Sequence, residues 1–137
     1  MDTRRLDVFF YGLFMDQELL IAKGARPTNI RLASVRDYAL RIGERAALVR
    51  EHSARVYGVV MSLSHDELDK LYSEPGLRAY RPEPVLADTS NGEVIAALCY
   101  NLVEPPSNDE HNPEYASKLR LVAQRIGLPA EYIASIR

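Results

Sequence analysis

Apolar and polar residues change their spacing several times along this chain, and these changes predict strands alternating with short helices. The first apolar run, "LDVFFY" at residues 6–11, is rich in β-branched and aromatic residues and predicts a strand. Alternating apolar positions predict further strands. A "GER" turn separates the second strand from the third, and the later strands span residues 30–43, 46–50, 54–63, 81–89 and 93–102.

Local signals mark the helices that lie between these strands. Asp16 can cap a helix over residues 17–23, and Gly24 suits its C-terminal end. Ser64 and Glu67 form a capping box, which predicts a second helix directly after the strand expected over residues 54–63. A side-chain cap therefore marks the predicted start of both helices.

The C-terminal part predicts two more helices. Asn112 can cap the first, and Pro113 fits its first turn. Gly127 ends that helix, and "LPAEYIASI" restarts a shorter one. The first helix carries an apolar stripe with a period of 3.6 residues, formed by Tyr115, Leu119, Val122, Ala123 and Ile126. Because strands outnumber helices and are joined largely as hairpins, we expect an α+β fold with a small antiparallel sheet or barrel.

Length and charge narrow the class of protein. The 137 residues suit a single domain over residues 1–137 with a sizeable core. The net charge is −2 and the arginines are scattered, which argues against a general nucleic-acid partner. No apolar run approaches the roughly 20 residues that span a bilayer, and "MDTRRLD" lacks the apolar core of a signal peptide. We therefore expect a cytoplasmic protein with no membrane partner.

The turn after the first strand is the first candidate site. In "YGLFMD" the strand turns at Gly12 toward a helix that begins near Asp16. Backbone N–H groups at such a turn bind carboxylates or oxyanions well, and glycine lets a ligand approach closely. A plain connection between a strand and a helix is the simpler interpretation of the same residues.

Glu74 is the second candidate. It follows a predicted helix and precedes Pro75, which restricts its backbone, and Tyr72 and Tyr80 are near it in sequence. A carboxylate among apolar groups has a raised pKa, which suits a residue that carries a proton near neutral pH. The simpler interpretation is a solvated loop acid. Glu83, the nearest rival, lies between two prolines on a predicted strand and reads as structural.

Neither a metal nor a cofactor is expected. His52, His65 and His111 are far apart in sequence, and no spacing typical of a metal site connects them. Cys99, which leaves no disulfide to form within the chain, lies among small apolar residues and is predicted to fill the core. Glu74 and the Gly12 turn therefore remain the places where chemistry is expected.

Four stretches together resemble the γ-glutamyl cyclotransferase-like family. They are "FFYGLF", "VYGVVMSLSHDELDKLYSEPG", "LRAYRPEPV" and "NPEYASKLRLVAQRIGLPAEYIASI". The resemblance implies a small, mostly antiparallel β-barrel with flanking helices and a cavity at one end. It also implies a lyase that needs no cofactor and releases 5-oxoproline from a small γ-glutamyl compound, freeing an amine or amino acid.

The resemblance implies roles for particular residues. Glu74 corresponds to the catalytic glutamate, as general acid and base, and Tyr80 and Tyr115 to tyrosines that line the cavity. The turn that holds the glutamyl part of the substrate corresponds to Tyr11, Gly12, Leu13 and Phe14. Two features depart from the family pattern: bulky apolar residues follow the glycine of the turn, and a proline directly follows the glutamate.

Alternatives with other functions stay open. A non-catalytic module that binds a small carboxylate or a partner protein would explain the Leu13–Phe14 pair, because these side chains could fill the cavity. A third hypothesis is a related reaction at Glu74, such as a cyclising amine transfer on a γ-glutamyl-tagged natural product. Arg78 and Arg81 flank Tyr80, and one of them could bind a carboxylate of the leaving amino acid, or both could be exposed edge residues. The oligomeric state does not follow from the residues.

Overall fold

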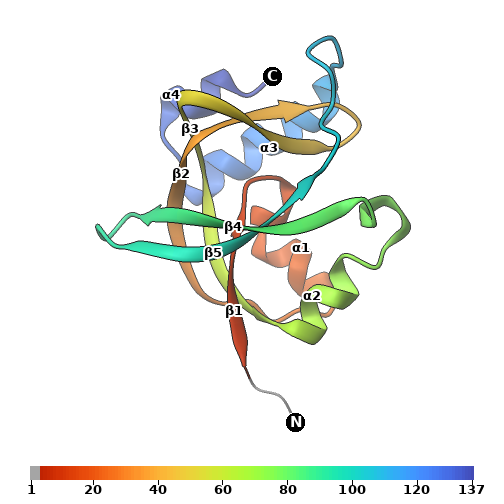
Figure 1. Cartoon of the computed structure of the whole chain (residues 1–137), viewed down its shortest axis with the longest axis vertical. Coiled ribbons are helices and arrows are strands. Elements are labelled where there is room, and N and C mark those ends of the chain that lie inside the picture. Colours follow the sequence, from red (N-terminus) through yellow and green to blue (C-terminus); the bar gives the residue numbers. More distant parts are fainter. Residues whose placement is uncertain (1–3) are drawn as a thin grey trace.

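The apolar runs of the chain close into a β-barrel, seen in a computed structural model that describes residues 4–137 (Figure 1). The strands follow one another around the barrel in the order β1-β3-β2-β4-β5. Neighbours are antiparallel except β5 and β1, which run parallel with Val8 opposite Leu98. The expected small, mostly antiparallel barrel with flanking helices is confirmed. Its strands are β1 (Arg5–Phe10), β2 (Thr28–Ile42), β3 (Ala46–Ser64), β4 (Tyr80–Thr89) and β5 (Val94–Leu102).

Helices connect and flank the strands. Figure 1 shows α1 and α2 on one side of the barrel, with α3 and α4 toward the C-terminus. None of the helices within the described part of the chain is long and apolar enough to cross a membrane. The α-helices are α1 (Gln17–Ala22), α2 (His65–Leu71), α3 (Pro113–Ile126) and α4 (Ala130–Ser135), and two single 3₁₀ turns are η1 (Leu13–Met15) and η2 (Pro75–Leu77).

The capping box that predicted α2 is present. The Ser64 hydroxyl accepts from the Glu67 N–H at 3.2 Å, and the Ser64 N–H donates to a Glu67 carboxylate oxygen at 2.8 Å. Leu63 before the cap and Leu68 inside the helix are both buried, as a hydrophobic staple requires. This local signal ends β3 and sets where α2, and the Glu74 loop after it, leave the barrel.

The caps of α3 are confirmed as well. The Asn112 side chain accepts from the Tyr115 N–H at 3.1 Å, and it also donates to the Gly43 carbonyl at 3.0 Å. The helix ends at Gly127, whose φ of 86° is the left-handed conformation that glycine adopts without strain. Asn112 therefore joins α3 to the turn between β2 and β3.

The two strands expected over residues 46–50 and 54–63 are in fact one strand, β3. The polar stretch between them is an irregularity in the β2–β3 ladder. Ser53 and Asp37 both have positive φ there, and the Ser53 N–H donates to the Asp37 carboxylate at 3.0 Å. The two-strand prediction was wrong because exposed polar residues mark a bulge here, not the end of a strand.

Parts of β1 and β3 are buried on both faces. Val8, Phe9 and Phe10 are successive residues of β1, and all are almost completely buried. Successive side chains point to opposite faces of a strand, so one face must fill the barrel while helices cover the other. On β3, residues 59–63 show the same continuous burial. A continuous apolar run rather than alternation is the sequence pattern of such strands.

Gly58 allows β1 and β3 to approach each other. A Cβ atom at Gly58 would lie 2.1 Å from the Phe10 carbonyl oxygen, which is backbone and cannot rotate away. We expect Gly58→Ala to lower the free energy of unfolding by about 3 kcal/mol, because the barrel must deform locally. Urea denaturation of the purified protein would measure the change.

Gly92→Ala is the matched control. Gly92 has a φ of 89° and no atom near an added Cβ, so only backbone strain of about 1 kcal/mol is expected. Equal losses for both variants would contradict the steric explanation for Gly58.

Candidate functional site

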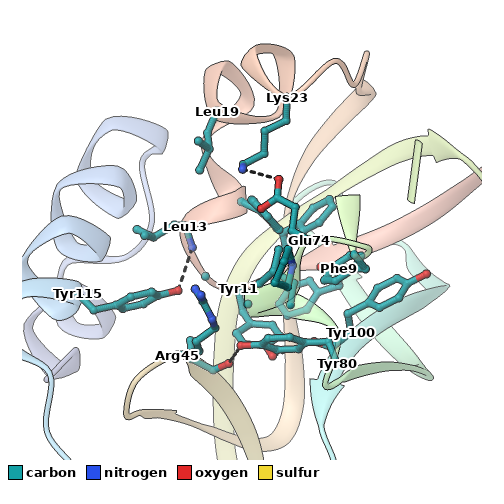
Figure 2. A pocket seen from close by; sticks show the side chains of 18 residues that line it. Phe9, Tyr11, Leu13, Leu19, Lys23, Arg45, Glu74, Tyr80, Tyr100 and Tyr115 are labelled. Atoms are coloured by element: carbon teal, nitrogen blue, oxygen red, sulfur yellow. Dashed lines mark hydrogen bonds and ion pairs between the residues drawn. The ribbon is translucent and has the colours of Figure 1, made fainter. Parts of the chain in front are cut away.

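A pocket of about 440 Å³ opens at one end of the barrel (Figure 2). The C-terminal ends of β1 and β5 and the N-terminal ends of β3 and β4 meet there, together with η1, η2, the end of α1 and the start of α3. Every residue that the sequence placed at the site lines this pocket: Tyr11, Gly12, Leu13, Phe14, Glu74, Tyr80 and Tyr115. Segments far apart in the sequence are therefore brought together as expected, while the roles of these residues stay predictions.

The turn after β1 forms one wall. The Leu13 N–H donates to the Tyr115 hydroxyl at 3.3 Å, so this backbone donor is directed toward the pocket and held by α3. A Cβ atom at Gly12 would lie 2.8 Å from the same hydroxyl, so glycine gives Tyr115 room to reach the turn. Asp16 caps α1 as predicted, with its side chain accepting from the Glu18 N–H at 3.1 Å. The long Leu13 hydrogen bond is one that an anionic ligand could replace.

Glu74 lies on the opposite wall, where Pro75 begins η2. Its carbonyl accepts from the Leu77 N–H at 2.9 Å, which fixes the backbone. One carboxylate oxygen, Oε1, accepts from Lys23 Nζ at 2.7 Å. The expectation of apolar surroundings was wrong, because the Glu74 side chain is 42% exposed and paired with a cation. Lys23 comes from the end of α1, so the ion pair joins two elements that are distant in sequence.

Tyrosines supply most of the polar lining. Burial raises the pKa of Tyr11, Tyr72 and Tyr80, so their hydroxyls stay neutral and can donate. The Tyr11 hydroxyl donates to the Tyr100 carbonyl at 2.8 Å, and that of Tyr80 donates to the Ala46 carbonyl. These bonds hold the two rings at the end of the barrel, where both residues line the pocket.

Aromatic rings packed against one another form part of the pocket wall. The ring of Tyr72 stacks on that of Tyr100, with centroids 3.9 Å apart and an angle of 9°. Phe14 meets Tyr72 edge to face at 6.0 Å and Phe10 at 6.2 Å. Phe14 is thus held in the wall, and the pocket beside it remains open. The sequence did not single out Tyr100, because alternation on a strand does not show which end of the barrel a ring faces.

Two cations at the pocket were missed from the sequence. Lys23 and Arg45 both line it, and Figure 2 shows the Arg45 side chain between Tyr115 and Tyr80. Lys23 reads as an ordinary residue at a helix end, and Arg45 as part of the "GER" turn. Nothing in the linear pattern signals that either one faces Glu74 or the tyrosines, since only closure of the barrel brings them there.

The arginines suggested for carboxylate binding lie elsewhere. Arg78 donates to the Ser73 carbonyl at 3.1 Å, and Arg81 donates to the Tyr80 carbonyl at 2.9 Å. Both are exposed, and neither lines the pocket. Of the two alternatives, the structure therefore agrees with exposed edge arginines, whose guanidinium groups bond to backbone carbonyls beside them in sequence.

The remaining chemical candidates lie outside the pocket. Across residues 4–137, no group of three His, Cys, Asp or Glu side chains is arranged to hold a metal ion. Cys99 is fully buried on β5, and burial raises the pKa of its thiol to about 12. The prediction that Cys99 fills the core is confirmed, and the thiolate needed for nucleophilic attack is strongly disfavoured.

The arrangement defines a class: a small closed barrel whose end pocket combines a glycine turn, one carboxylate and a tyrosine lining. The family described as "Gamma-glutamyl cyclotransferase, AIG2-like" matches residues 8–119. The chain belongs to this family, as its motifs indicated. A comparison with curated protein sequences finds no match.

Solved structures share the fold at low sequence identity. A protein named "Gamma-glutamyl cyclotransferase" superposes with a TM-score of 0.81 at 22% identity, covering 98% of this chain and 89% of its own. An uncharacterized protein from Homo sapiens superposes with a TM-score of 0.80 at 22% sequence identity, covering 97% of this chain and 88% of its own. An AIG2-like protein from Mus musculus superposes with a TM-score of 0.61 at 12% sequence identity, covering 81% of this chain and 90% of its own. At these identities the likeness establishes the fold.

The Leu13–Tyr115 hydrogen bond can be tested through stability. We expect Tyr115→Phe to lower the free energy of unfolding by about 1 kcal/mol, because the Leu13 N–H loses its acceptor. Urea denaturation followed by circular dichroism measures this loss.

Tyr57→Phe is the control, since the hydroxyl of this half-buried tyrosine makes no side-chain hydrogen bond within the described residues. Its stability should stay within about 0.5 kcal/mol of the wild type. A Tyr115→Phe variant as stable as the control would show that the turn does not need this contact.

Proposed function

We propose that this protein is a γ-glutamyl cyclotransferase that converts a small γ-glutamyl compound into 5-oxoproline and a free amine or amino acid. The observation that carries the proposal is the Glu74 carboxylate, which lies across the pocket from the Gly12 turn in a chain of this family. The volume of about 440 Å³ suits a ligand of this size.

The reaction needs positioning and proton transfer. The substrate's α-amine attacks its own γ-carbonyl carbon, a C–N bond forms, and the original amide C–N bond breaks. Because the reaction is intramolecular, the main task of the protein is to hold the substrate in the folded shape that brings the two groups together. The aromatic wall of Phe14, Tyr72 and Tyr100 supplies a surface for that purpose.

Glu74 is assigned the proton transfers. Its carboxylate takes a proton from the α-ammonium group, which makes the amine nucleophilic, and returns it to the leaving nitrogen. After the attack it takes a second proton from the new ring nitrogen, which becomes the lactam N–H, and passes it to the departing amine, which leaves as an ammonium. Lys23 Nζ donates to Oε1, while Oε2 has no hydrogen-bond partner within residues 4–137. A substrate ammonium can therefore approach Oε2 first and then replace the Lys23 ammonium.

The turn is assigned to an anion of the substrate. The Leu13 N–H is directed at the pocket and bonded only to a neutral hydroxyl at 3.3 Å. A carboxylate or a developing oxyanion is a stronger acceptor than a hydroxyl, so it would take over this donor. Tyr115, once released, could donate its own proton to the same ligand.

A non-catalytic carboxylate-binding module is the second candidate. It is favoured by the Lys23–Glu74 ion pair, because the lysine ammonium, 2.7 Å from Oε1, occupies one of the two carboxylate oxygens that a catalytic acid and base would use. The two candidates share the pocket and differ in whether bound γ-glutamyl compounds are turned over.

Release of 5-oxoproline decides between them. Wild-type protein is incubated with γ-glutamyl amino acids, γ-glutamyl amines and glutathione, and the product is measured by mass spectrometry. We expect Glu74→Gln to lower kcat by about 10²–10⁴-fold, since it removes the proton carrier with little change of shape. Folded wild-type protein that binds these compounds and forms no product would support the binding module instead.

Glu83→Gln is the matched control. Glu83 is the other candidate carboxylate from the sequence, and it lies on β4 outside the pocket. Its variant should retain activity within about twofold of the wild type, because Gln keeps an oxygen that accepts from the Asn101 side chain and the residue does not line the pocket. Loss of activity in both variants would point to a general effect of charge and not to Glu74.

A further inference from the structure

Arg45 is a cation at the pocket without an anionic partner. Among the described residues, four arginines on the strands of the barrel pair with carboxylates: Arg5, Arg31, Arg36 and Arg55. Lys23, the second cation of the pocket, is paired with Glu74. No carboxylate of the described residues forms an ion pair with Arg45, and its guanidinium makes no hydrogen bond to them. A half-buried guanidinium in an aromatic pocket is a ready site for an anion.

The backbone around Arg45 keeps its guanidinium in the pocket. A Cβ atom at Gly76 would lie 2.1 Å from Arg45 Nη2, so the guanidinium rests against the backbone of η2. The positive charge of Arg45 also acts on the two tyrosines beside it, lowering the pKa of Tyr80 and of Tyr115 against the larger raising effect of burial. Arg45 thus lies between the tyrosines and the segment that begins at Glu74.

Charge complementarity indicates which ligands suit this pocket. Its charged residues are Lys23, Arg45 and Glu74, two cations and one carboxylate. A γ-glutamyl α-amino acid with an uncharged side chain carries two carboxylates and one ammonium, which is the complementary set. A γ-glutamyl alkylamine carries one of each and would leave one of the protein's cations buried by the ligand without a partner, which is costly.

We propose that Arg45 binds the carboxylate of the leaving amino acid, and that it makes the pocket selective for γ-glutamyl α-amino acids over γ-glutamyl alkylamines. This proposal rests on the proposed function. The leaving nitrogen must reach Glu74, and in an amino acid the carboxylate carbon is two bonds from that nitrogen. Arg45 packs on Gly76, two residues after Glu74, so its planar fork is beside the place where this carboxylate falls.

The test compares γ-glutamyl-alanine with γ-glutamyl-alaninamide, which differ only in the charge of the leaving group. For the wild type we expect kcat/KM for 5-oxoproline release to favour the acid by about 10- to 100-fold, the range for a hydrogen bond to a charged group. Arg45→Gln should bring this ratio close to one by lowering kcat/KM for the acid, while the amide changes by about twofold or less.

Two further variants test whether the position of the Arg45 guanidinium matters, and whether any arginine near the site has the same effect. Gly76→Ala keeps Arg45 but forces its guanidinium to move, so it should reduce the same ratio. Arg78→Gln removes an exposed arginine outside the pocket and should leave the ratio unchanged. A ratio unaffected by Arg45→Gln, or equal losses with both substrates, would overturn the proposal.

Binding measurements distinguish failure of the proposal from failure of the reaction. The Glu74→Gln protein is titrated calorimetrically with the same two compounds, with and without Arg45→Gln. Tighter binding of the acid that depends on Arg45, without any turnover by the wild type, would sustain the carboxylate site and reject the cyclotransferase. Turnover with no Arg45-dependent preference in Kd or kcat/KM would reject the site and sustain the reaction.

Discussion

The pairing of β1 on both of its edges is the interaction on which the rest of the structure depends. β1 lies between β3 and β5, and its parallel contact with β5 closes the barrel. Buried backbone groups must be hydrogen-bonded, so a barrel left open here would expose two strand edges beside the core. The same strand runs directly into Tyr11 and Gly12. The pairing that closes the barrel therefore also positions the pocket wall formed by the turn after β1.

The pocket is assembled from pieces that the barrel brings to one end. Glu74 and Lys23 arrive at the ends of different helices, Arg45 from the turn between β2 and β3, and Tyr115 from α3. Their contacts are mostly between side chains and the backbone of another segment, such as Leu13 with Tyr115. Because each wall of the pocket comes from a different segment between strands or helices, the shape of the site depends on the barrel as a whole.

Much of the fold and of the site could be predicted from local sequence signals. The features that were missed depend on contacts between residues far apart in the sequence. The capping box at Ser64, the cap at Asn112 and the glycine turn each act within a few residues, so they could be found in the sequence. The uninterrupted β3 was missed because a bulge and a strand end look alike without the partner strand. Arg45 and Lys23 were missed because a charged residue on a turn or helix end has no local mark of the pocket it faces.

In the Lys23–Glu74 ion pair, the lysine competes with any ligand cation for the carboxylate. Lys23 is tethered to α1, so its ammonium is present at the carboxylate at a high effective concentration. Free amines and small inorganic cations must displace it without gaining anything else from the pocket. A ligand that also places carboxylates on the turn or on Arg45 has further contacts to offset that exchange. In the proposed reaction, Lys23 therefore disfavours ligands that offer Glu74 a cation and no other contact.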